Sequence, residues 1–137
     1  MCGKLRLTAY DRQGRELWCI EQSNLIVTGA YQITAEALAG LASAKISKVA
    51  AGTNGTVPVA EDTSITSSTV INVQSVEYPQ PGTVRFNFTF GYYDAVGVSI
   101  REFGLLSDNG RLFARKVREP IEKTKYMSIV GAWEITI

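Results

Sequence analysis

The sequence contains no histidine, and it has two cysteines, Cys2 and Cys19. Histidine is the commonest general base and the commonest zinc ligand, and its unperturbed pKa makes it the usual switch near neutral pH. Two thiols without histidine do not complete an ordinary four-ligand zinc site. These absences argue against most hydrolytic mechanisms, against a structural zinc site and against a histidine-based response to pH.

Long apolar runs and an excess of one charge are missing as well. No stretch approaches the roughly 20 apolar residues of a membrane-spanning helix. The first residues, MCGKLRLTAYD, lack the apolar region of a cleaved secretory signal. The formal net charge of +1 provides no overall positive field to attract nucleic acid. We therefore expect folding in the cytoplasm, no membrane partner and no nucleic-acid partner.

Familiar catalytic motifs do not occur. The glycines of AAGTNGT have neither the spacing nor the lysine of a phosphate-binding loop, and there is no G-x-S-x-G nucleophile motif. The sequence predicts that the scattered carboxylates lie in turns or on the surface; they are Glu61, Asp62, Asp94, Glu102 and Asp108. We expect a protein that is not an enzyme, with no catalytic, cofactor-binding or metal-binding residues.

The chain does contain regular alternation of apolar and polar residues. Val84, Phe86, Phe88 and Phe90 alternate with polar neighbours, and Ile129, Gly131, Trp133, Ile135 and Ile137 share one face of a last strand. Residues 69–79, TVINVQSVEYP, indicate one further strand. A single helix is predicted over residues 30–43, with apolar side chains near one face; they are Ile33, Leu38 and Leu41.

Length, composition and turn spacing complete the fold prediction. A chain of 137 residues that is 45% hydrophobic and 20% charged suits one soluble domain covering residues 1–137. Turn signals such as DRQG, PQPG and DNG recur every 8 to 12 residues or so. We predict a mainly β fold, an antiparallel β-sandwich or barrel of seven to eight strands with one short α-helix.

The first two strands form a predicted hairpin around DRQG. If paired residues sum to about 25, Cys19 faces Arg6 and lies far from Cys2. An internal disulfide is then not expected, because its Cα atoms must lie within roughly 7 Å. The expectation is two free thiols, with Cys19 partly buried.

The densest group of charges lies near the C-terminus, in IREFGLLSDNGRLFARKVRE. We take six of its side chains as candidate interaction residues, namely Arg101, Glu102, Arg111, Arg115, Lys116 and Arg118. A solvated or salt-bridged strand face, a protein–protein contact and a phosphate-binding face are the three interpretations. Nearby carboxylates reduce the positive field, which disfavours the third. Arginine is common at protein interfaces because its planar fork pairs with carboxylates.

The segment SIREFGLLSDNGRLFARKV resembles a recurring segment of tail-fibre and baseplate-associated proteins of tailed bacteriophages. The pattern there is approximately I-R-E-[IVF]-G-L-[FL]-x-x-[DN]-G-x-L-[FI]-A. It maps onto Ile100–Leu106, Asn109, Gly110 and Leu112–Ala114. The opening residues 3–40 and the middle segment ISKVAAGTNGTVPVAEDTSI are similar to such virion proteins too, so the resemblance covers most of the chain.

The resemblance implies a structural protein of the virion, assembled in the bacterial cytoplasm. It would act in tail or baseplate assembly or in fibre attachment, with other phage structural proteins as partners and as a trimer or ring of copies. Because fibres of this kind continue into a shaft and tip whereas this chain stops at Ile137, a small connector, baseplate or decoration component is favoured. A capsid decoration or head-fibre module is one alternative. A carbohydrate-binding β-sandwich is another, with an aromatic platform drawn from Trp18, Tyr92, Tyr93 or Trp133.

The motif also has a physical interpretation. Asn109-Gly110 is a hairpin signal, and Gly104 allows a neighbouring backbone to approach closely or forms a bulge. On a regular strand, the adjacent residues Arg101 and Glu102 point to opposite faces. We expect the motif to be mainly a hairpin that places apolar side chains in the core; these are Phe103, Leu105, Phe113 and Val117.

Overall fold

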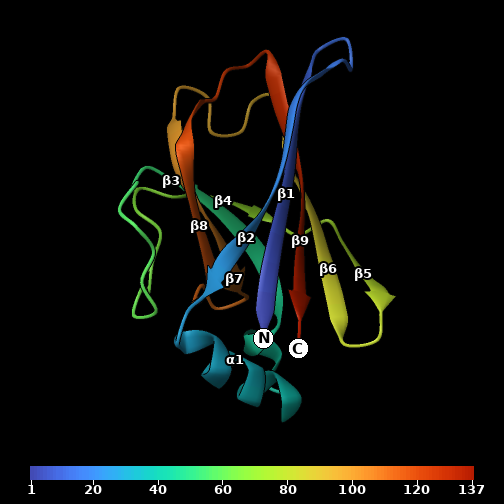
Figure 1. Ribbon diagram of the computed structural model, residues 1–137, viewed down its shortest axis with the longest axis vertical. Coiled ribbons are helices and arrows are strands. Elements are labelled where there is room, and N and C mark those ends of the chain that lie inside the picture. The colour runs from blue at the N-terminus through green and yellow to red at the C-terminus, as the bar shows by residue number, and fades with distance from the viewer.

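The computed structural model describes residues 1–137 and shows a mainly β protein, 55% strand and 9% helix. Nine antiparallel strands curve into a half-barrel, and one short helix lies across one end (Figure 1). In chain order the elements are β1 (Cys2–Asp11), β2 (Glu16–Ile26), α1 (Gly29–Leu38), a 3-10 turn (Ala42–Ala44), β3 (Ile46–Gly52), β4 (Thr69–Asn72), β5 (Ser75–Gln80), β6 (Thr83–Phe90), β7 (Ser99–Ser107), β8 (Leu112–Glu122) and β9 (Met127–Thr136).

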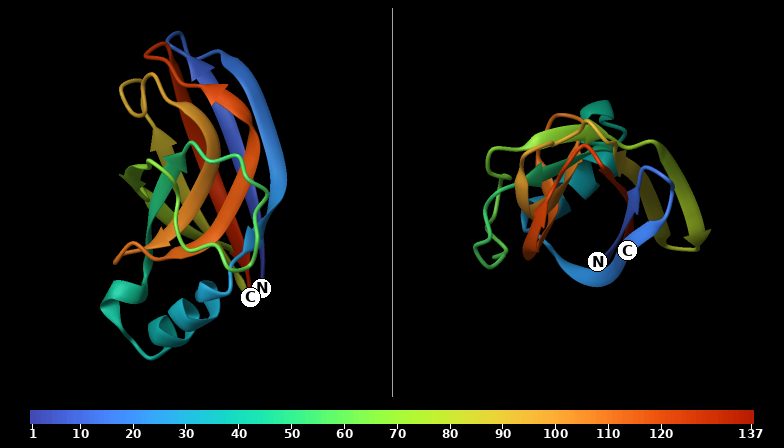
Figure 2. Two further views of the ribbon diagram at one scale, coloured as in Figure 1. Left: turned by 90° about the vertical axis from the view of Figure 1, so that its left-hand side faces the viewer. Right: turned by 90° about the horizontal axis from the view of Figure 1, so that it is seen from above.

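The strands form one sheet in the order β4-β3-β7-β8-β2-β1-β9-β6-β5. The first and last strands are therefore neighbours near its middle, with Cys2 paired to Thr136 and Asp11 paired to Met127. The two chain ends lie side by side at the α1 end of the barrel, and the view from above in Figure 2 shows the sheet curling around its core. The prediction of a mainly β antiparallel fold with one short helix is confirmed, with nine strands instead of seven or eight.

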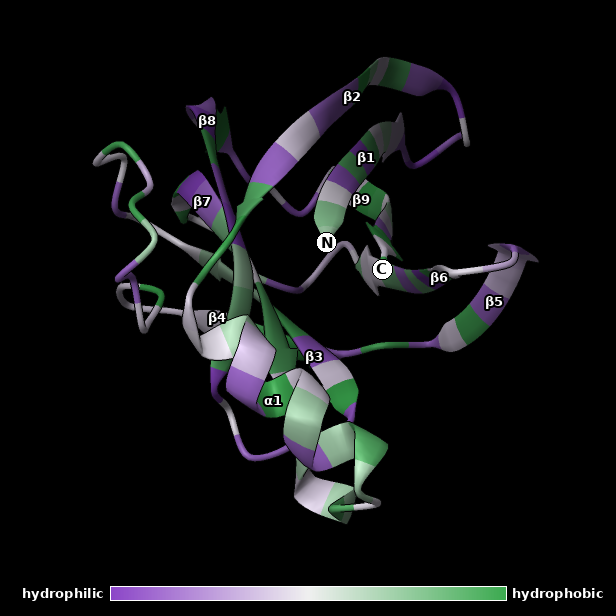
Figure 3. Ribbon diagram, turned by 60° about the horizontal axis from the view of Figure 1, so that its bottom comes forward, coloured by the Kyte–Doolittle hydropathy of each residue, from purple (hydrophilic) through white to green (hydrophobic).

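Side-chain alternation places the core on the inner face of the sheet. Phe86, Phe88 and Phe90 are buried, and the rings of Phe88 and Phe90 meet edge to face at 6.0 Å between centroids. Figure 3 shows the alternation as bands of hydrophilic and hydrophobic colour along β1. The predicted face of the last strand is also buried from Ile129 to Ile135, whereas Ile137, beyond the end of β9, is exposed.

Residues 69–79 do not form one strand. The chain changes partners at Val73 and Gln74: the N–H of Val73 donates to Ser47 O of β3, and the N–H of Gln74 donates to Asn87 O of β6. As a result β4 and β5 lie on opposite edges of the sheet, joined by two residues. This switch accounts for the ninth strand, and the alternation of side chains carries no information about it.

The first hairpin has a different register from the predicted one. Cys19 pairs with Thr8, not with Arg6. The turn is held by Asp11, whose Oδ1 accepts the N–H groups of Gln13 and Arg15, and a register irregularity between Ala9 and Tyr10 shifts the pairing further. Both cysteines are free, and Cys19 is exposed rather than partly buried because it lies on the outer face.

The helix is shorter than predicted and uses less of its apolar surface. α1 ends at Leu38, and Gly40 follows with φ +88°, a left-handed conformation that suits the end of a helix. Ile33 is buried against the barrel, but Leu38 is 89% exposed and Leu41 is exposed as well. The predicted helix over residues 30–43 with these three residues near one face is therefore only partly formed, because the helix ends at Leu38 and Leu41 lies beyond it.

Candidate interaction site

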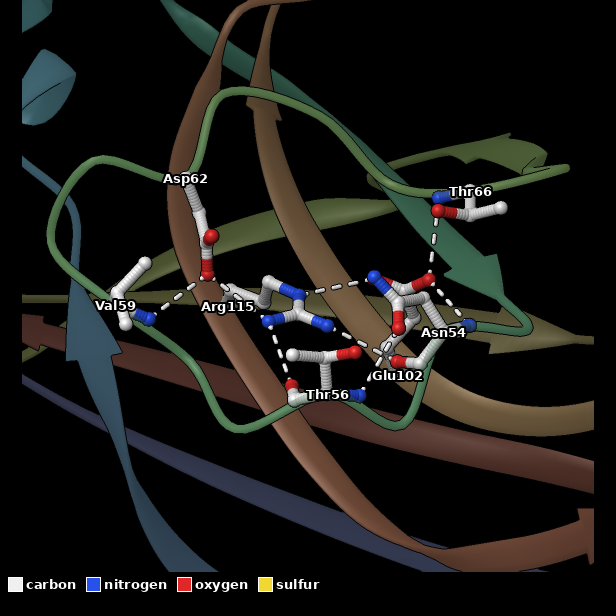
Figure 4. Close-up of polar contacts among 7 residues, drawn as sticks. All are labelled: Asn54, Thr56, Val59, Asp62, Thr66, Glu102 and Arg115. Atoms are coloured by element: carbon white, nitrogen blue, oxygen red, sulfur yellow. Dashed lines mark hydrogen bonds and ion pairs between the residues drawn. The ribbon is translucent and has the colours of Figure 1, made fainter.

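The motif residues Glu102 and Arg115 form a buried ion pair on neighbouring strands. Glu102 lies on β7 and Arg115 on β8, and their side chains are 0% and 2% exposed. The Nε of Arg115 donates to Glu102 Oε1 at 2.9 Å. Both groups lie on the outer side of the sheet, where a long loop covers them (Figure 4).

That cover is the segment between β3 and β4, residues 53–68, which we call the β3–β4 loop. Arg115 Nη1 donates to Thr56 O at 3.1 Å and to Asp62 Oδ2 at 2.9 Å, and Nη2 donates to Asn54 O at 3.0 Å. Glu102 Oε2 accepts the backbone N–H groups of Asn54 at 2.7 Å and Thr66 at 3.1 Å. The pair therefore binds the loop at both of its ends and in its middle (Figure 4).

Two glycines bring the loop close to the sheet. A Cβ on Gly104 would lie 2.5 Å from Ile65 Cγ1, and a Cβ on Gly52 would lie 2.4 Å from Ile65 Cγ2. Ile65 packs there against a small apolar cluster that is separate from the main core and contains Val27, Ala50, Leu106 and Leu112. Gly104 thus permits a close approach, but by the side chains of Ile65 and Leu112 and not by the neighbouring backbone that was predicted.

The contacts of this cluster hold the β3–β4 loop against the sheet. Burial of charged groups is costly unless they are paired and fully hydrogen-bonded, and no buried side-chain N or O atom in the protein lacks a partner. Glu102 and Arg115, proposed from the sequence as interaction residues, direct their hydrogen bonds to each other and to the β3–β4 loop that covers them. Because both side chains are buried, a partner protein could not contact them.

The other four candidates lie elsewhere. Arg111 pairs with Glu36 of α1 and so links the β7–β8 turn to the helix. The hydrogen bonds from Arg111 and then Gln32 lower the pKa of Glu36. Arg101 is exposed beside Gly55 of the β3–β4 loop, and the register irregularity between Ile100 and Glu102 places it on the same side as Glu102, not on the opposite face.

Lys116 and Arg118 lie where β2 and β8 separate. Lys116 pairs with the core residue Phe103 and so belongs to the inner side, and its Nζ donates to Ser23 O of β2 at 3.0 Å. The guanidinium carbon of Arg118 lies 5.5 Å from the centroid of the Trp18 ring. Of the six sequence candidates, these two face an interruption in the sheet. The prediction that Val117 lines the core is wrong, because Val117 pairs with Glu102 on the outer side and is half-buried.

Desolvation lowers the pKa of Lys116, and the positive charge of Arg118 lowers it further. Desolvation likewise lowers the pKa of Arg118, opposed by a smaller effect of Glu119. The ion pairs of the protein involve other cations, which are Lys4, Arg15, Arg85, Arg111 and Arg115. Lys116 and Arg118 are thus two adjacent, partly dehydrated cations without a paired carboxylate.

The outer face of the other half of the sheet carries matched charges instead. Arg85 of β6 binds Glu134 of β9 at 2.8 Å and approaches Glu77 of β5 at 3.6 Å, and Lys4 of β1 binds Glu21 of β2 at 3.2 Å. Cross-strand pairs of this kind favour one register, and they are satisfied within the chain. This face therefore offers less unpaired charge than the region around Lys116.

A third group of side chains lies at the end of the barrel opposite α1. The Arg12 guanidinium lies 4.7 Å from the Tyr92 ring centroid and 5.2 Å from that of Tyr93, and Tyr93 is 78% exposed. Below them Lys123 is buried, and its Nζ donates to three backbone carbonyls, at Gly91, Tyr92 and Thr124. Desolvation lowers the pKa of Lys123, with an opposing effect of Asp94.

Sequence reasoning missed two of the residues that organise these regions. Asp62 was interpreted as a turn or surface residue, and its contact with Arg115 spans 53 positions of the sequence. Lys123 gave no signal, because its partners are backbone carbonyls that any sequence supplies. Of the proposed aromatic platform, Trp133 is buried with its Nε1 donating to Asn24 Oδ1, and Trp18 is half-buried.

No family model, curated protein or solved structure matches the chain. No group of three or more histidine, cysteine, aspartate or glutamate side chains is placed to hold a metal ion. None of the helices has the length and apolar character needed to cross a membrane.

Proposed function

We propose that the chain is a non-enzymatic structural protein of a tailed bacteriophage or prophage, which acts in tail or baseplate assembly or fibre attachment through protein–protein contacts. The observation that carries the proposal is the segment Ile100–Ala114, with its resemblance to tail-fibre and baseplate-associated proteins. In the fold this segment forms most of the β7–β8 hairpin, and its Glu102 joins Arg115 in fixing the β3–β4 loop. A motif with this task is a scaffold element.

The surface supports an assembly role in physical terms. The sheet has two edge strands, β4 and β5, and all six residues of β5 are exposed. Exposed strand edges are natural places for contacts between chains. The unpaired cations Lys116 and Arg118 add a second charged surface. We propose that the assembled form is a homo-oligomer, a trimer or a ring, with other virion proteins as neighbours.

The test is localisation in purified particles. Antibodies against the protein, used for immunogold electron microscopy of virions, should label the tail or baseplate, and mass spectrometry should find the chain in the same particles. Light scattering of the purified protein should give the mass of an oligomer. Label on the head would favour the capsid decoration alternative. A free monomer that is absent from virions would refute the proposal.

Carbohydrate binding is a second candidate because of one observation, the exposed Tyr93 beside the Arg12 guanidinium. Aromatic rings presented on rigid loops can stack on sugars, and the buried Lys123 fixes the loop that carries Tyr93. Glycan-array binding that is lost in Tyr93→Ala but kept in Tyr78→Ala would support it. Tyr78 is a suitable control because it is 79% exposed and lies on β5. An array without binding would refute this candidate.

A further inference from the structure

The sheet is interrupted between β2 and β8. These strands share two paired positions, Leu25 with Arg115 and Ile26 with Ala114. Beyond them β2 continues for nine residues toward the other end of the barrel, paired with β1 on one side and with no strand on the other. Figure 1 shows β2 and β8 diverging toward the end opposite α1. We call this region the β2–β8 opening.

The opening exposes backbone groups that a neighbouring strand would normally bind. The Ser23 carbonyl points into it, since it accepts the Lys116 ammonium. Successive residues of a strand alternate in the side toward which their N–H and C=O groups point. The backbone groups of Glu21 and Cys19 therefore point the same way as those of Ser23. On β8, Phe113 O accepts the N–H of Val27, so by the same alternation the groups of Val117 point toward the opening.

Side chains partly fill the space where a strand could lie. Lys116 donates a hydrogen bond to the Ser23 carbonyl, and the Arg118 guanidinium lies over the face of the Trp18 ring. Neither cation has a paired carboxylate, and both are partly dehydrated. Dehydrated cations gain more from a new carboxylate than solvated ones do, because little further water must be removed.

We propose that the β2–β8 opening binds an extended, acidic segment of a partner protein, which adds as a strand between β2 and β8 and pairs its carboxylates with Lys116 and Arg118. Backbone hydrogen bonds to β2 would provide affinity, and the two cations would provide selectivity for acidic side chains. Trp18, released from Arg118, would pack on the added strand. This inference rests on the proposed function only in assuming that the chain works through protein contacts.

The outer edges of the sheet fit such a segment less well. β4 has four residues, and β5 has six with Pro79 among them, which cannot donate a backbone hydrogen bond. Glu77 on β5 is already close to Arg85 and would repel an acidic partner. The β2–β8 opening combines a longer free edge with unpaired charge of the opposite sign.

A binding experiment tests the proposal with defined probes. The probe is a fluorescein-labelled heptapeptide of alternating valine and glutamate, measured by fluorescence anisotropy against the same peptide with lysine in place of glutamate. We expect the glutamate peptide alone to bind. Lys116→Ala and Arg118→Ala should each weaken binding about tenfold, the effect of one charge-assisted contact. Lys45→Ala, which removes an exposed cation near α1, should leave binding unchanged.

Amide hydrogen exchange on the unchanged protein provides a second readout that does not depend on variants. The N–H groups of Cys19, Glu21 and Ser23 should exchange rapidly in the free protein and become protected when the glutamate peptide is added. Equal binding of both peptides, equal effects of the three variants or unchanged exchange would each overturn the proposal. Protection of the same amides without peptide, lost on dilution, would also overturn it and would identify a second copy of the chain as the occupant.

These outcomes are separable from those of the proposed function. Peptide binding concerns the β2–β8 opening alone, and it can fail while immunogold labelling still places the protein in the virion tail. Conversely, a protein that is absent from virions could still bind the acidic peptide. The first result would overturn this inference and leave the function proposal standing, and the second would do the reverse.

Discussion

The buried pair of Glu102 and Arg115 makes the sharpest prediction about stability. Replacing Arg115 by methionine keeps much of its volume but removes its ion pair with Glu102 and its three hydrogen bonds to the β3–β4 loop. Glu102, with 0% exposure, is left as a buried charge without its cation, held only by the backbone N–H groups of Asn54 and Thr66. Breaking a buried ion pair in this way costs about 3–5 kcal/mol. We expect Arg115→Met to lower the free energy of unfolding by that amount.

The assay is equilibrium urea unfolding, followed by tryptophan fluorescence and by circular dichroism. Arg111→Met is the matched control, because Arg111 is 38% exposed in its pair with Glu36 and exposed pairs contribute at most about 1 kcal/mol. Adding Glu102→Gln to Arg115→Met should restore part of the loss. Glutamine removes the buried charge and keeps an oxygen that can accept the N–H groups of the loop.

Two results would refute the reasoning. One is an Arg115→Met protein no less stable than Arg111→Met. The other is a double variant, Arg115→Met with Glu102→Gln, that is less stable than Arg115→Met alone. In addition, amide exchange in residues 53–68 should accelerate in Arg115→Met and not in Arg111→Met, since the loop depends on Arg115.

Three further predictions concern other parts of the fold. Gly131→Ala should cost about 1–3 kcal/mol in urea unfolding, because the new Cβ would lie 2.1 Å from Phe88 Cζ; Phe88→Leu in the same chain should make the combined loss smaller than the sum. The pKa of Glu36 lies below its ordinary 4.5 in the folded protein. Its carboxylate therefore stabilises the fold above pH 4.5, and this contribution is lost as the pH falls through the folded pKa. Glu36→Gln should be less stable than the unchanged protein at pH 7, and the difference should shrink below pH 4.5. Lys123→Met should cost about 1–3 kcal/mol, because three backbone carbonyls lose their shared donor.

Each of these has a contrary outcome. Additive losses for Gly131→Ala and Phe88→Leu would show that the ring and the new methyl group do not collide. A Glu36→Gln difference that is constant from pH 7 to pH 3 would show that the carboxylate is not paired in solution. An unchanged midpoint for Lys123→Met would show that water satisfies the three carbonyls instead.

Local features of the sequence predicted local features of the fold. The β7–β8 hairpin follows from alternation and from the DNG turn, where Gly110 has φ +84°, and the face formed by Phe86, Phe88 and Phe90 follows from strict alternation. The signals that set these elements lie within a few residues of one another. The burial of Phe103, Leu105 and Phe113 was predictable for the same reason.

Features that depend on distant residues were not predictable in this way. Glu102 contacts Asn54 across 48 positions and Arg115 contacts Asp62 across 53, so no local pattern marks either as buried. The alternating pattern around an arginine on a strand is the same whether the side chain is exposed to solvent or covered by a loop. The interruption between β2 and β8 is equally invisible, because it reflects which strands lack a neighbour.

The central position of β1 and β9 has a consequence for folding during synthesis. β1 and β9 are separated by more than 100 residues, so this part of the sheet can close only after the chain has been synthesised as far as β9. Until then the β1–β2 hairpin has both outer edges free, and such edges pair readily with other chains. Closing so long a loop also slows folding. The nascent chain should therefore depend on chaperones, and its yield should fall when many copies are translated at once.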